Sequence, residues 1–248
     1  KKVAVKKVGT TKSNGTIITF QPDPTIFKEG IEFDLKTIID NVRQQAYLVK
    51  KLRVTVIDAR EITAKFDPTT AFWFRELNLE APSTTYYFEG GISSMVRHYN
   101  QLQKPIHETV FYCEKEQDNV GVEIALQYVD DIASRIVPFA NNIYNSEHGT
   151  HVTGFKTALT RVLNNYGKKN NLIKDADGPF TGDDVLEGLT VVISVKLAEI
   201  QFEGQTKAKL GSMEAQGATT TVFGDAFSNF LEENPDQAKS IIMKGLLA

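Results

Sequence analysis

The sequence has little that would place it outside a reducing compartment or inside a membrane. Its 248 residues contain one cysteine, Cys113, so no internal disulfide can form and we expect a cytoplasmic protein. No apolar run approaches the roughly 20 residues that span a bilayer, and no signal-peptide pattern opens the chain. The net charge is only −3 at pH 7. This value excludes a chain that is strongly basic as a whole, although one basic face could exist within it.

The composition is that of an ordinary folded protein. Hydrophobic residues make up 41% and charged residues 24%, which excludes a disordered, collagenous or coiled-coil chain. The length is compatible with one large domain or two ordinary ones. The chain begins at Lys1 rather than at a methionine, and we expect it to be a fragment of a longer protein.

The N-terminal third is predicted to mix strands and helices. Asn14-Gly15 between apolar segments at 3–8 and 16–20 predicts a β-hairpin, because both turn residues accept positive φ. Apolar residues at helical spacing from 35 to 49 predict an amphipathic helix with Asp34 as its N-cap. The other elements expected here are strands at 53–58 and 86–88, an insertion or long hairpin at 60–85, and a short helix at 92–102.

The C-terminal part carries the clearest periodicity. Strict alternation at 120–128 predicts a strand with one buried face. An apolar stripe at 152–166 predicts a helix of about four turns. Thr181 to Asp184 resembles a capping box with Asp in place of Glu. The remaining predicted elements are strands at 110–113, 135–143 and 189–197 and helices at 222–230 and after Pro235.

Three groups of reactive side chains do not predict a catalytic or metal site. His148 and His151 are three residues apart, but no third ligand stands at metal spacing, so we expect His151 to satisfy hydrogen bonds of a loop or helix cap. Cys113 lies in an apolar strand, where a thiol has a raised pKa and is inert. Asp183 and Asp184 fit the charge of a helix N-terminus better than an acid–base pair.

The loop 204–211 is different, because it collects groups that bind phosphate. Two glycines flank an amide, a hydroxyl and two lysines between a predicted strand and a predicted helix. A lysine supplies a mobile positive charge for phosphate, and Gln205 supplies an oriented donor. Basic polar loops are common on protein surfaces, so composition alone leaves open whether this one binds an anion.

The residues of this loop resemble a known motif. Phe202-Glu203-Gly204-Gln205-Thr206-Lys207, followed by Lys209-Leu210-Gly211, looks like the QTK loop of the ATPase subunits of bacterial type IIA topoisomerases, the B subunits of DNA gyrase and topoisomerase IV. Further blocks agree with this family in order and spacing: 15–16, 20–23, 88–92, 105–107, 139–143, 149–151, 154–156, 159–164 and 187–189.

The resemblance implies an α+β fold in two parts. Residues 1–104 would be the C-terminal portion of a GHKL-type ATPase domain, and residues 105–248 a transducer domain similar to domain 2 of ribosomal protein S5. The family's function is to couple ATP binding and hydrolysis to DNA strand passage and supercoiling. We therefore expect DNA and the A subunit of gyrase or of topoisomerase IV as partners, and homodimerisation through the missing N-terminal region of the complete subunit.

Site residues are carried over by position. In the family, the lysine and glutamine of the QTK loop reach the γ-phosphate of ATP, which implies this role for Lys207 and Gln205. Thr16 matches a threonine at the adenine end of the nucleotide pocket. Lys156 matches a basic position on the transducer helix that lines the DNA cavity. His148 departs from the pattern, because the family normally has glycine there.

The family's catalytic ATPase residues lie N-terminal to Lys1, so no catalytic residue and no metal ligand is expected in this chain. ATP and Mg²⁺ would be used by the complete subunit rather than held tightly by this fragment. Two other functions stay open: a mismatch-repair or chaperone ATPase, which would lack the QTK loop, and a stand-alone S5-like nucleic-acid-binding module.

Overall fold

The computed structural model describes residues 7, 9–10, 12, 14–28, 30–62, 80–176 and 178–248. The chain divides into two compact units. The smaller comprises Lys1–Asp40 and Thr55–Thr84, and the larger comprises Asn41–Val54 and Thr85–Ala248. Among the described residues, no helix is long and apolar enough to cross a membrane.

One short two-stranded sheet stands at the boundary between the two units in the sequence. Strand β1 (Val54–Ile57) pairs with β2 (Ser83–Tyr86), and the amide of Asp58 donates to the carbonyl of Pro82 at 2.9 Å. The strand expected at 86–88 is therefore placed too late, since only its first residue belongs to β2. Of the insertion predicted at 60–85, residues 63–79 lie outside the described residues.

The predicted hairpin strand at 16–20 is wrong. These residues form no strand, and the side chains of Ile18 and Phe20 are 81% and 72% exposed. A strand needs a neighbouring strand to satisfy its backbone groups, and none of the described residues pairs with this segment. The segment expected to pair with it, 3–8, lies mostly outside the described residues.

Helix α1 (Leu35–Leu48) begins as its sequence predicts. The carboxylate of Asp34 accepts hydrogen bonds from the hydroxyl and the amide of Thr37, which confirms Asp34 as the N-cap and lowers its pKa. At the C-terminal end of α1, which belongs to the larger unit, the ring of Tyr47 stacks on Phe88 with 3.7 Å between centroids.

The larger unit is built on a mixed five-stranded sheet with the order β3-β4-β7-β5-β6. Its strands are β3 (Phe111–Gln117), β4 (Val120–Tyr128), β5 (Arg135–Ala140), β6 (Ile143–Tyr144) and β7 (Leu189–Leu197). Only the pairing of β5 with β7 is parallel. Asp118-Asn119 and Asn141-Asn142 turn the two hairpins at positive φ, a conformation that Asn and Asp tolerate.

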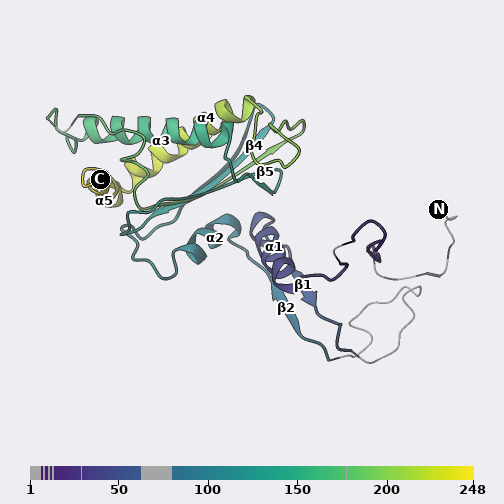
Figure 1. Ribbon diagram of the computed structural model, residues 1–248. Coiled ribbons are helices and arrows are strands. Elements are labelled where there is room, and N and C mark those ends of the chain that lie inside the picture. Colours follow the sequence, from purple (N-terminus) through teal and green to yellow (C-terminus); the bar gives the residue numbers. More distant parts are fainter. Residues whose placement is uncertain are drawn as a thin grey trace. The chain divides into compact units, whose positions relative to one another are not determined.

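Helices α3 (Thr150–Lys169) and α4 (Glu214–Glu233) cover one face of this sheet, and α5 (Pro235–Gly245) follows (Figure 1). The two long helices approach closely at Gly154, where a Cβ would lie 2.4 Å from the carbonyl oxygen of Gln216. Phe155 packs against Phe223 with 4.6 Å between ring centroids. The main core lies between these helices and the sheet.

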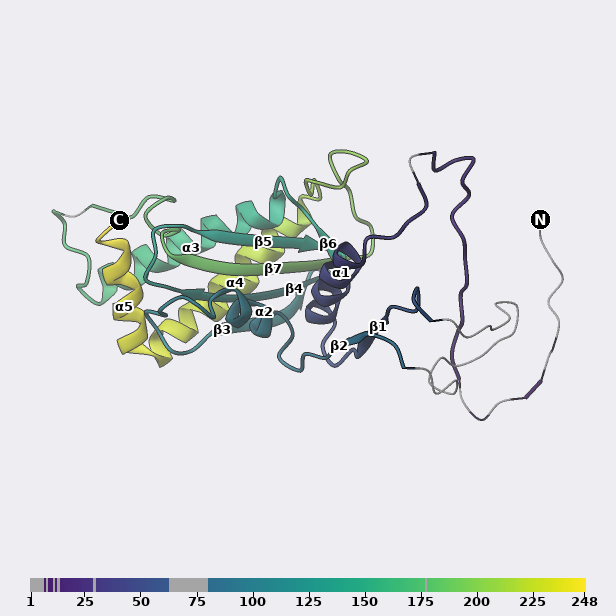
Figure 2. The same ribbon diagram turned by 60° about the horizontal axis from the view of Figure 1, so that its bottom comes forward.

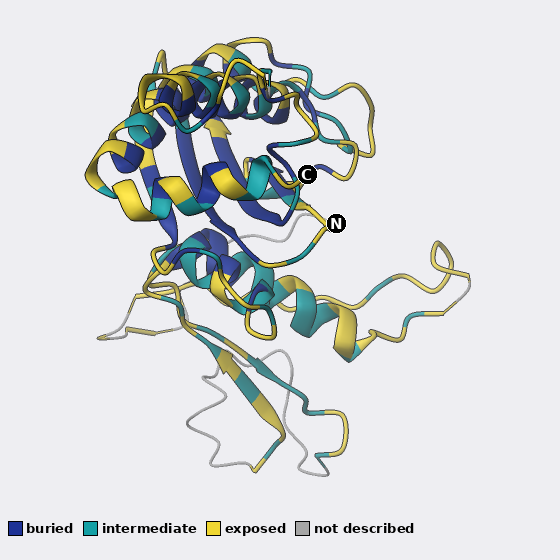
Figure 3. Cartoon of the chain, turned by 90° about the vertical axis from the view of Figure 1, so that its left-hand side faces the viewer, coloured by how far each residue is buried: buried dark blue, intermediate teal, exposed yellow. Residues whose placement is uncertain are grey.

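Both faces of the sheet are covered, which corrects the prediction of a half-exposed strand at 120–128. Helix α2 (Gly91–Tyr99) lies on the other face, where a second core contains Ala125, Val192 and Phe139 (Figures 1 to 3). Small and polar residues at alternate positions were expected to face water. Ala125 is instead buried in this second core, and Glu123 and Gln127 are buried as well, whereas Gly121 is half-buried.

The predicted capping box is present, but it does not start an α-helix. The amide of Thr181 donates to the carboxylate of Asp184 at 2.6 Å, and the amide of Asp184 donates to the hydroxyl of Thr181 at 3.4 Å. The residues from 182 to 188 form successive turns. The reciprocal bonds therefore stabilise a turn that leads into β7.

Candidate functional site

The candidate site is the loop from Gln201 to Gly211, which joins β7 to α4. Backbone bonds close it into a narrow hairpin: the amide of Glu203 donates to the carbonyl of Lys209 at 3.0 Å, and that of Gly211 donates to Gln201 at 2.9 Å. At the tip, the amide of Lys207 donates to the carbonyl of Gly204 at 3.1 Å. The backbone of this loop is therefore held in one conformation by its own hydrogen bonds.

The segment 145–150, which leads from β6 into the first residue of α3, holds the returning side of this loop. The amide of Glu147 donates to the carbonyl of Ala208 at 2.9 Å, and the amide of Leu210 donates to His148 at 3.1 Å. The contact is close, because a Cβ on Gly149 would lie 2.4 Å from the carbonyl oxygen of Leu210. We call residues 145–150 the strap.

Two departures from ordinary backbone geometry occur in these segments. His148 has a φ of 66° and Lys207 a φ of 57°, both in the left-handed region that favours glycine. The resemblance predicts glycine at the position of His148, and the backbone there has a conformation that favours glycine. The strained peptide at Lys207 requires support from its neighbours.

Gln205 and Lys207 both lie at the loop tip, and both are exposed. Within the described part of the chain, neither side chain has a hydrogen bond or ion pair. Lys209, in contrast, forms an ion pair with Glu203 at 3.1 Å. A pinned backbone that carries one unpaired cation and one free amide is suited to bind an anion with little ordering cost.

Lys156 lies near the base of the same loop. It lines a hollow of about 330 Å³ between the start of α3 and the loop, together with His148 and Lys209. Burial and the charge of Lys156 lower the pKa of His148. Thr16, the fourth predicted site residue, is in the smaller unit, where it is exposed and belongs to no helix or strand. The structure thus brings three of the four predicted residues to one region of the larger unit.

Of the other reactive side chains singled out from the sequence, His151 and Cys113 lie in the core. No group of three potential metal ligands occurs among the described residues. The prediction that His151 makes hydrogen bonds in a loop or helix cap is wrong. Its side chain is fully buried, and neither ring nitrogen has a partner among the described residues. Burial lowers the pKa of His151 to about 3. Cys113 is buried as expected, and burial raises the pKa of its thiol to about 12.

A charged cluster on the other face of the sheet was not predicted. Lys50 forms ion pairs with Glu114 at 2.7 Å and with Glu123 at 3.1 Å, and the hydroxyl of Tyr112 lies within hydrogen-bond distance of both carboxylates. These contacts with Lys50 and Tyr112 lower the pKa of Glu114. The alternating pattern predicted that Glu123 would face solvent. Its ion pair with Lys50 was not predictable, because no sequence pattern shows that the segment after α1 packs against this face of the sheet.

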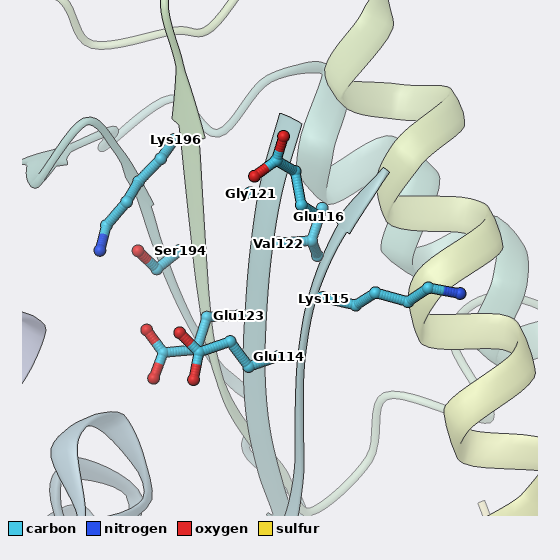
Figure 4. A pocket seen from close by; sticks show the side chains of 8 residues that line it. All are labelled: Glu114, Lys115, Glu116, Gly121, Val122, Glu123, Ser194 and Lys196. Atoms are coloured by element: carbon cyan, nitrogen blue, oxygen red, sulfur yellow. The ribbon is translucent and has the colours of Figure 1, made fainter. Parts of the chain in front are cut away.

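This cluster borders a hollow of about 330 Å³ on strands β3, β4 and β7. Figure 4 shows the carboxylates of Glu114 and Glu123 converging there, while Lys115 points to the opposite side of the sheet. Gly121 and Ser194 also line the hollow, and the hydroxyl of Ser194 is buried without a partner among the described residues.

Comparison with known proteins identifies the family of this chain. The family model for DNA gyrase B matches residues 91–248. The chain is 44% identical to the DNA gyrase B subunit of Bacillus mycoides over 98% of its length and 56% of that protein. It is 45% identical to the DNA gyrase B subunit of Halalkalibacterium halodurans over 97% of its length and 35% of that protein. The chain therefore spans between about a third and about half of these relatives.

Solved structures give the same answer. The 43K ATPase domain of Thermus thermophilus gyrase B, solved with an aminocoumarin, superposes with a TM-score of 0.75 at 33% identity and covers 91% of this chain and 56% of that one. The topoisomerase IV ATP-binding domain of Francisella tularensis has a TM-score of 0.69 over 88% of this chain and 54% of that one, and at 23% identity it supports the fold alone. The fold is thus α+β and of the GHKL ATPase and transducer type, and the chain belongs to the DNA gyrase B family.

Proposed function

We propose that this chain is part of the ATPase subunit of DNA gyrase and couples ATP binding and hydrolysis to DNA strand passage and supercoiling. The observation that carries the proposal is the loop tip, where Gln205 and Lys207 project unpaired, among the described residues, from a backbone fixed by the strap. The Thermus thermophilus relative is described as an ATPase domain. An unpaired lysine beside a free amide fits the terminal phosphate of a nucleoside triphosphate.

The proposed chemistry is that of a sensor. ATP supplies the phosphate anhydride whose hydrolysis drives the cycle, together with Mg²⁺, in the complete subunit. Lys207 contributes positive charge to the terminal phosphate, and Gln205 donates an oriented hydrogen bond. These contacts favour one arrangement of the loop while the phosphate is present, and their loss releases it. Thr16 is proposed to contact the adenine end of the nucleotide.

The proposed DNA contact uses Lys156 on α3. A lysine on a helix surface contacts phosphates rather than base edges, so this contact would be independent of sequence and sensitive to salt. DNA and the gyrase A subunit are the proposed partners, and the complete subunit would dimerise through its N-terminal region. Residues 1–104 and 105–248 remain our proposed boundaries for the ATPase portion and the transducer.

Substitution of Lys207 in a complete subunit tests the proposal. Lys207→Ala removes a charge-assisted contact, which is worth about 1.5–3 kcal/mol, so a non-hydrolysable ATP analogue should bind roughly 10- to 150-fold more weakly. ATP-driven supercoiling with the A subunit should be lost. Lys209→Ala is the matched control, because Lys209 is already paired with Glu203 at the surface. Unchanged supercoiling by the Lys207→Ala subunit would overturn the assignment.

The alternative is the B subunit of topoisomerase IV. The relatives from Bacillus mycoides and Halalkalibacterium halodurans, both named for gyrase, favour gyrase. Pairing the complete subunit with each A subunit separates the two: supercoiling with the gyrase partner supports our proposal, and decatenation only with the topoisomerase IV partner contradicts it. A stand-alone nucleic-acid-binding module would instead bind DNA tightly at physiological salt and be indifferent to changes at Gln205 and Lys207.

A further inference from the structure

Asn145 is fully buried beneath the loop, at the first position of the strap. Its side-chain amide nitrogen lies 2.8 Å from the carbonyl oxygen of Lys207 and donates a hydrogen bond to it, across 62 residues of sequence. This bond differs from the other hydrogen bonds between the strap and the loop, because its donor is a side chain and its acceptor is the backbone of Lys207. The other backbone bonds between the two segments reach Ala208 and Leu210.

The orientation of this amide is dictated by its partner. A carbonyl oxygen only accepts hydrogen bonds, so the nitrogen of Asn145 and not its oxygen must face Lys207. The amide oxygen then has no partner in the described part of the chain. A buried acceptor without a partner is unfavourable. An apolar side chain would avoid that cost, so the contact with Lys207 is the distinctive contribution of the amide.

Asn145 is itself held by the sheet. Its backbone amide donates to the carbonyl of Pro138 on β5 at 3.0 Å, and its carbonyl accepts from the amide of His148 at 2.9 Å. Pro138 lies within the paired region of β5 and β7. The amide group is therefore presented to the loop from a residue anchored on a core strand and not from another loop tip.

Lys207 needs such a support. Its φ of 57° is unfavourable for a residue with a side chain, and two bonds hold its peptide: the turn bond to Gly204 and the bond from Asn145. The bond to Gly204 lies within the loop tip, so it does not connect Lys207 to the rest of the fold. The Asn145 bond is the one that ties Lys207 to the sheet.

We propose that Asn145 is a positioning residue that fixes the peptide of Lys207, so that its ammonium group is presented where the terminal phosphate of ATP binds. This inference rests on the proposed function of Lys207. Asn145 is buried below the loop and has no contact with the nucleotide in this proposal. Its loss should weaken binding of nucleotides that carry a γ-phosphate and leave nucleotides without one unaffected.

The test compares two nucleotides in a complete subunit. Asn145→Ala should weaken binding of a non-hydrolysable ATP analogue about 5- to 10-fold, the value of one net hydrogen bond, while ADP affinity changes less than about twofold. Asn100→Ala is the matched control. Asn100 is a buried amide that donates to Gln127 at 3.1 Å, and Gln127 lies at the end of β4 that is remote from the loop after β7. That variant should preserve the ratio of the two affinities.

The outcomes separate this inference from the proposed function. If Lys207→Ala weakens the analogue and Asn145→Ala does not, Asn145 is no positioning residue. If neither variant weakens the analogue, the proposed role of Lys207 fails as well. Equal weakening of ADP and the analogue would show a merely structural role and overturn the inference.

Two further measurements keep the test decisive. In the double variant Asn145→Ala with Lys207→Ala, analogue binding should be no weaker than with Lys207→Ala alone, because Asn145 acts through Lys207. An additional loss of about 5-fold would contradict this. If the alanine variant does not fold, Asn145→Leu preserves most of the volume without the donor, and it should show the same selective loss of analogue binding. Unchanged analogue affinity in a folded Asn145→Leu subunit overturns the inference.

Discussion

Two buried histidines should make the stability of this chain depend on pH. His107 is 4% exposed; its Nε2 lies 2.8 Å from the amide nitrogen of Tyr128, and its Nδ1 lies 2.9 Å from the carbonyl oxygen of Thr109. An amide only donates and a carbonyl only accepts, so both contacts are satisfied by the neutral ring with its proton on Nδ1. Burial lowers the pKa of His107 to about 4 and that of His151 to about 3.

The sign of the effect follows from these directions. Both pKa values are lower in the folded state than the ordinary value of about 6.5, so the unfolded chain binds more protons below that pH. Stability is fully present above about pH 6.5 and falls as the pH drops toward about 4. Each histidine should reduce the free energy of unfolding by about 1.5 kcal/mol between about pH 6.5 and 5, because the slope approaches about 1.4 kcal/mol per pH unit for each proton.

Urea unfolding followed by circular dichroism between about pH 5 and 7.5 measures this dependence. His107→Gln keeps an acceptor for Tyr128 and does not titrate, so the decline should become smaller by about the 1.5 kcal/mol expected of His107. The comparison at about pH 7.5, where both rings are neutral, reports the cost of altered packing alone. If the variant loses as much stability on acidification as the parent chain, His107 does not carry the effect.

Three other outcomes follow from the structure. Gly149→Ala should lower the free energy of unfolding by at least about 2 kcal/mol, because φ is 138° and Leu210 leaves no room, whereas Gly217→Ala on open helix surface should be neutral or stabilising; denaturant melts compare them. Lys50→Met should lower the free energy of unfolding by about 1–3 kcal/mol at neutral pH, because Glu123 loses its ion pair and keeps only the hydrogen bond from Tyr112; a stability unchanged from the parent would refute the pairing. Cys113 should resist iodoacetamide at mildly alkaline pH in the folded chain and react in urea, as mass spectrometry can show.

Periodicity was informative where one core determines the pattern. The apolar stripe at 152–166 predicted α3, and the alternation at 120–128 predicted β4, because both face the same layer of buried side chains. The second core was not predictable, since Ala125 and Glu123 look like solvent-facing residues until α2 and Lys50 cover them. The alternation of β4 describes one face only.

The residues of the loop tip could be predicted from the sequence, but the contacts that support them could not. The loop residues Gln205 and Lys207 were identified by resemblance, and the structure presents both at the tip. Asn145 was missed because its partner is 62 residues away and no local pattern marks the contact. The strand expected at 16–20 failed for the opposite reason: local propensity was adequate, but the segment lacks a pairing partner among the described residues.

The strand order has a consequence for synthesis of the chain. β7 pairs with both β4 and β5, so it joins the two hairpins β3-β4 and β5-β6 into one sheet. It is also the last of these strands to leave the ribosome, since the whole of α3 and the turns after it separate β7 from β6. Until then the two hairpins present unpaired edges and apolar faces, which are aggregation-prone in a nascent chain. Residues 189–197 therefore complete the sheet late, and an interruption of translation before them leaves two halves that cannot join.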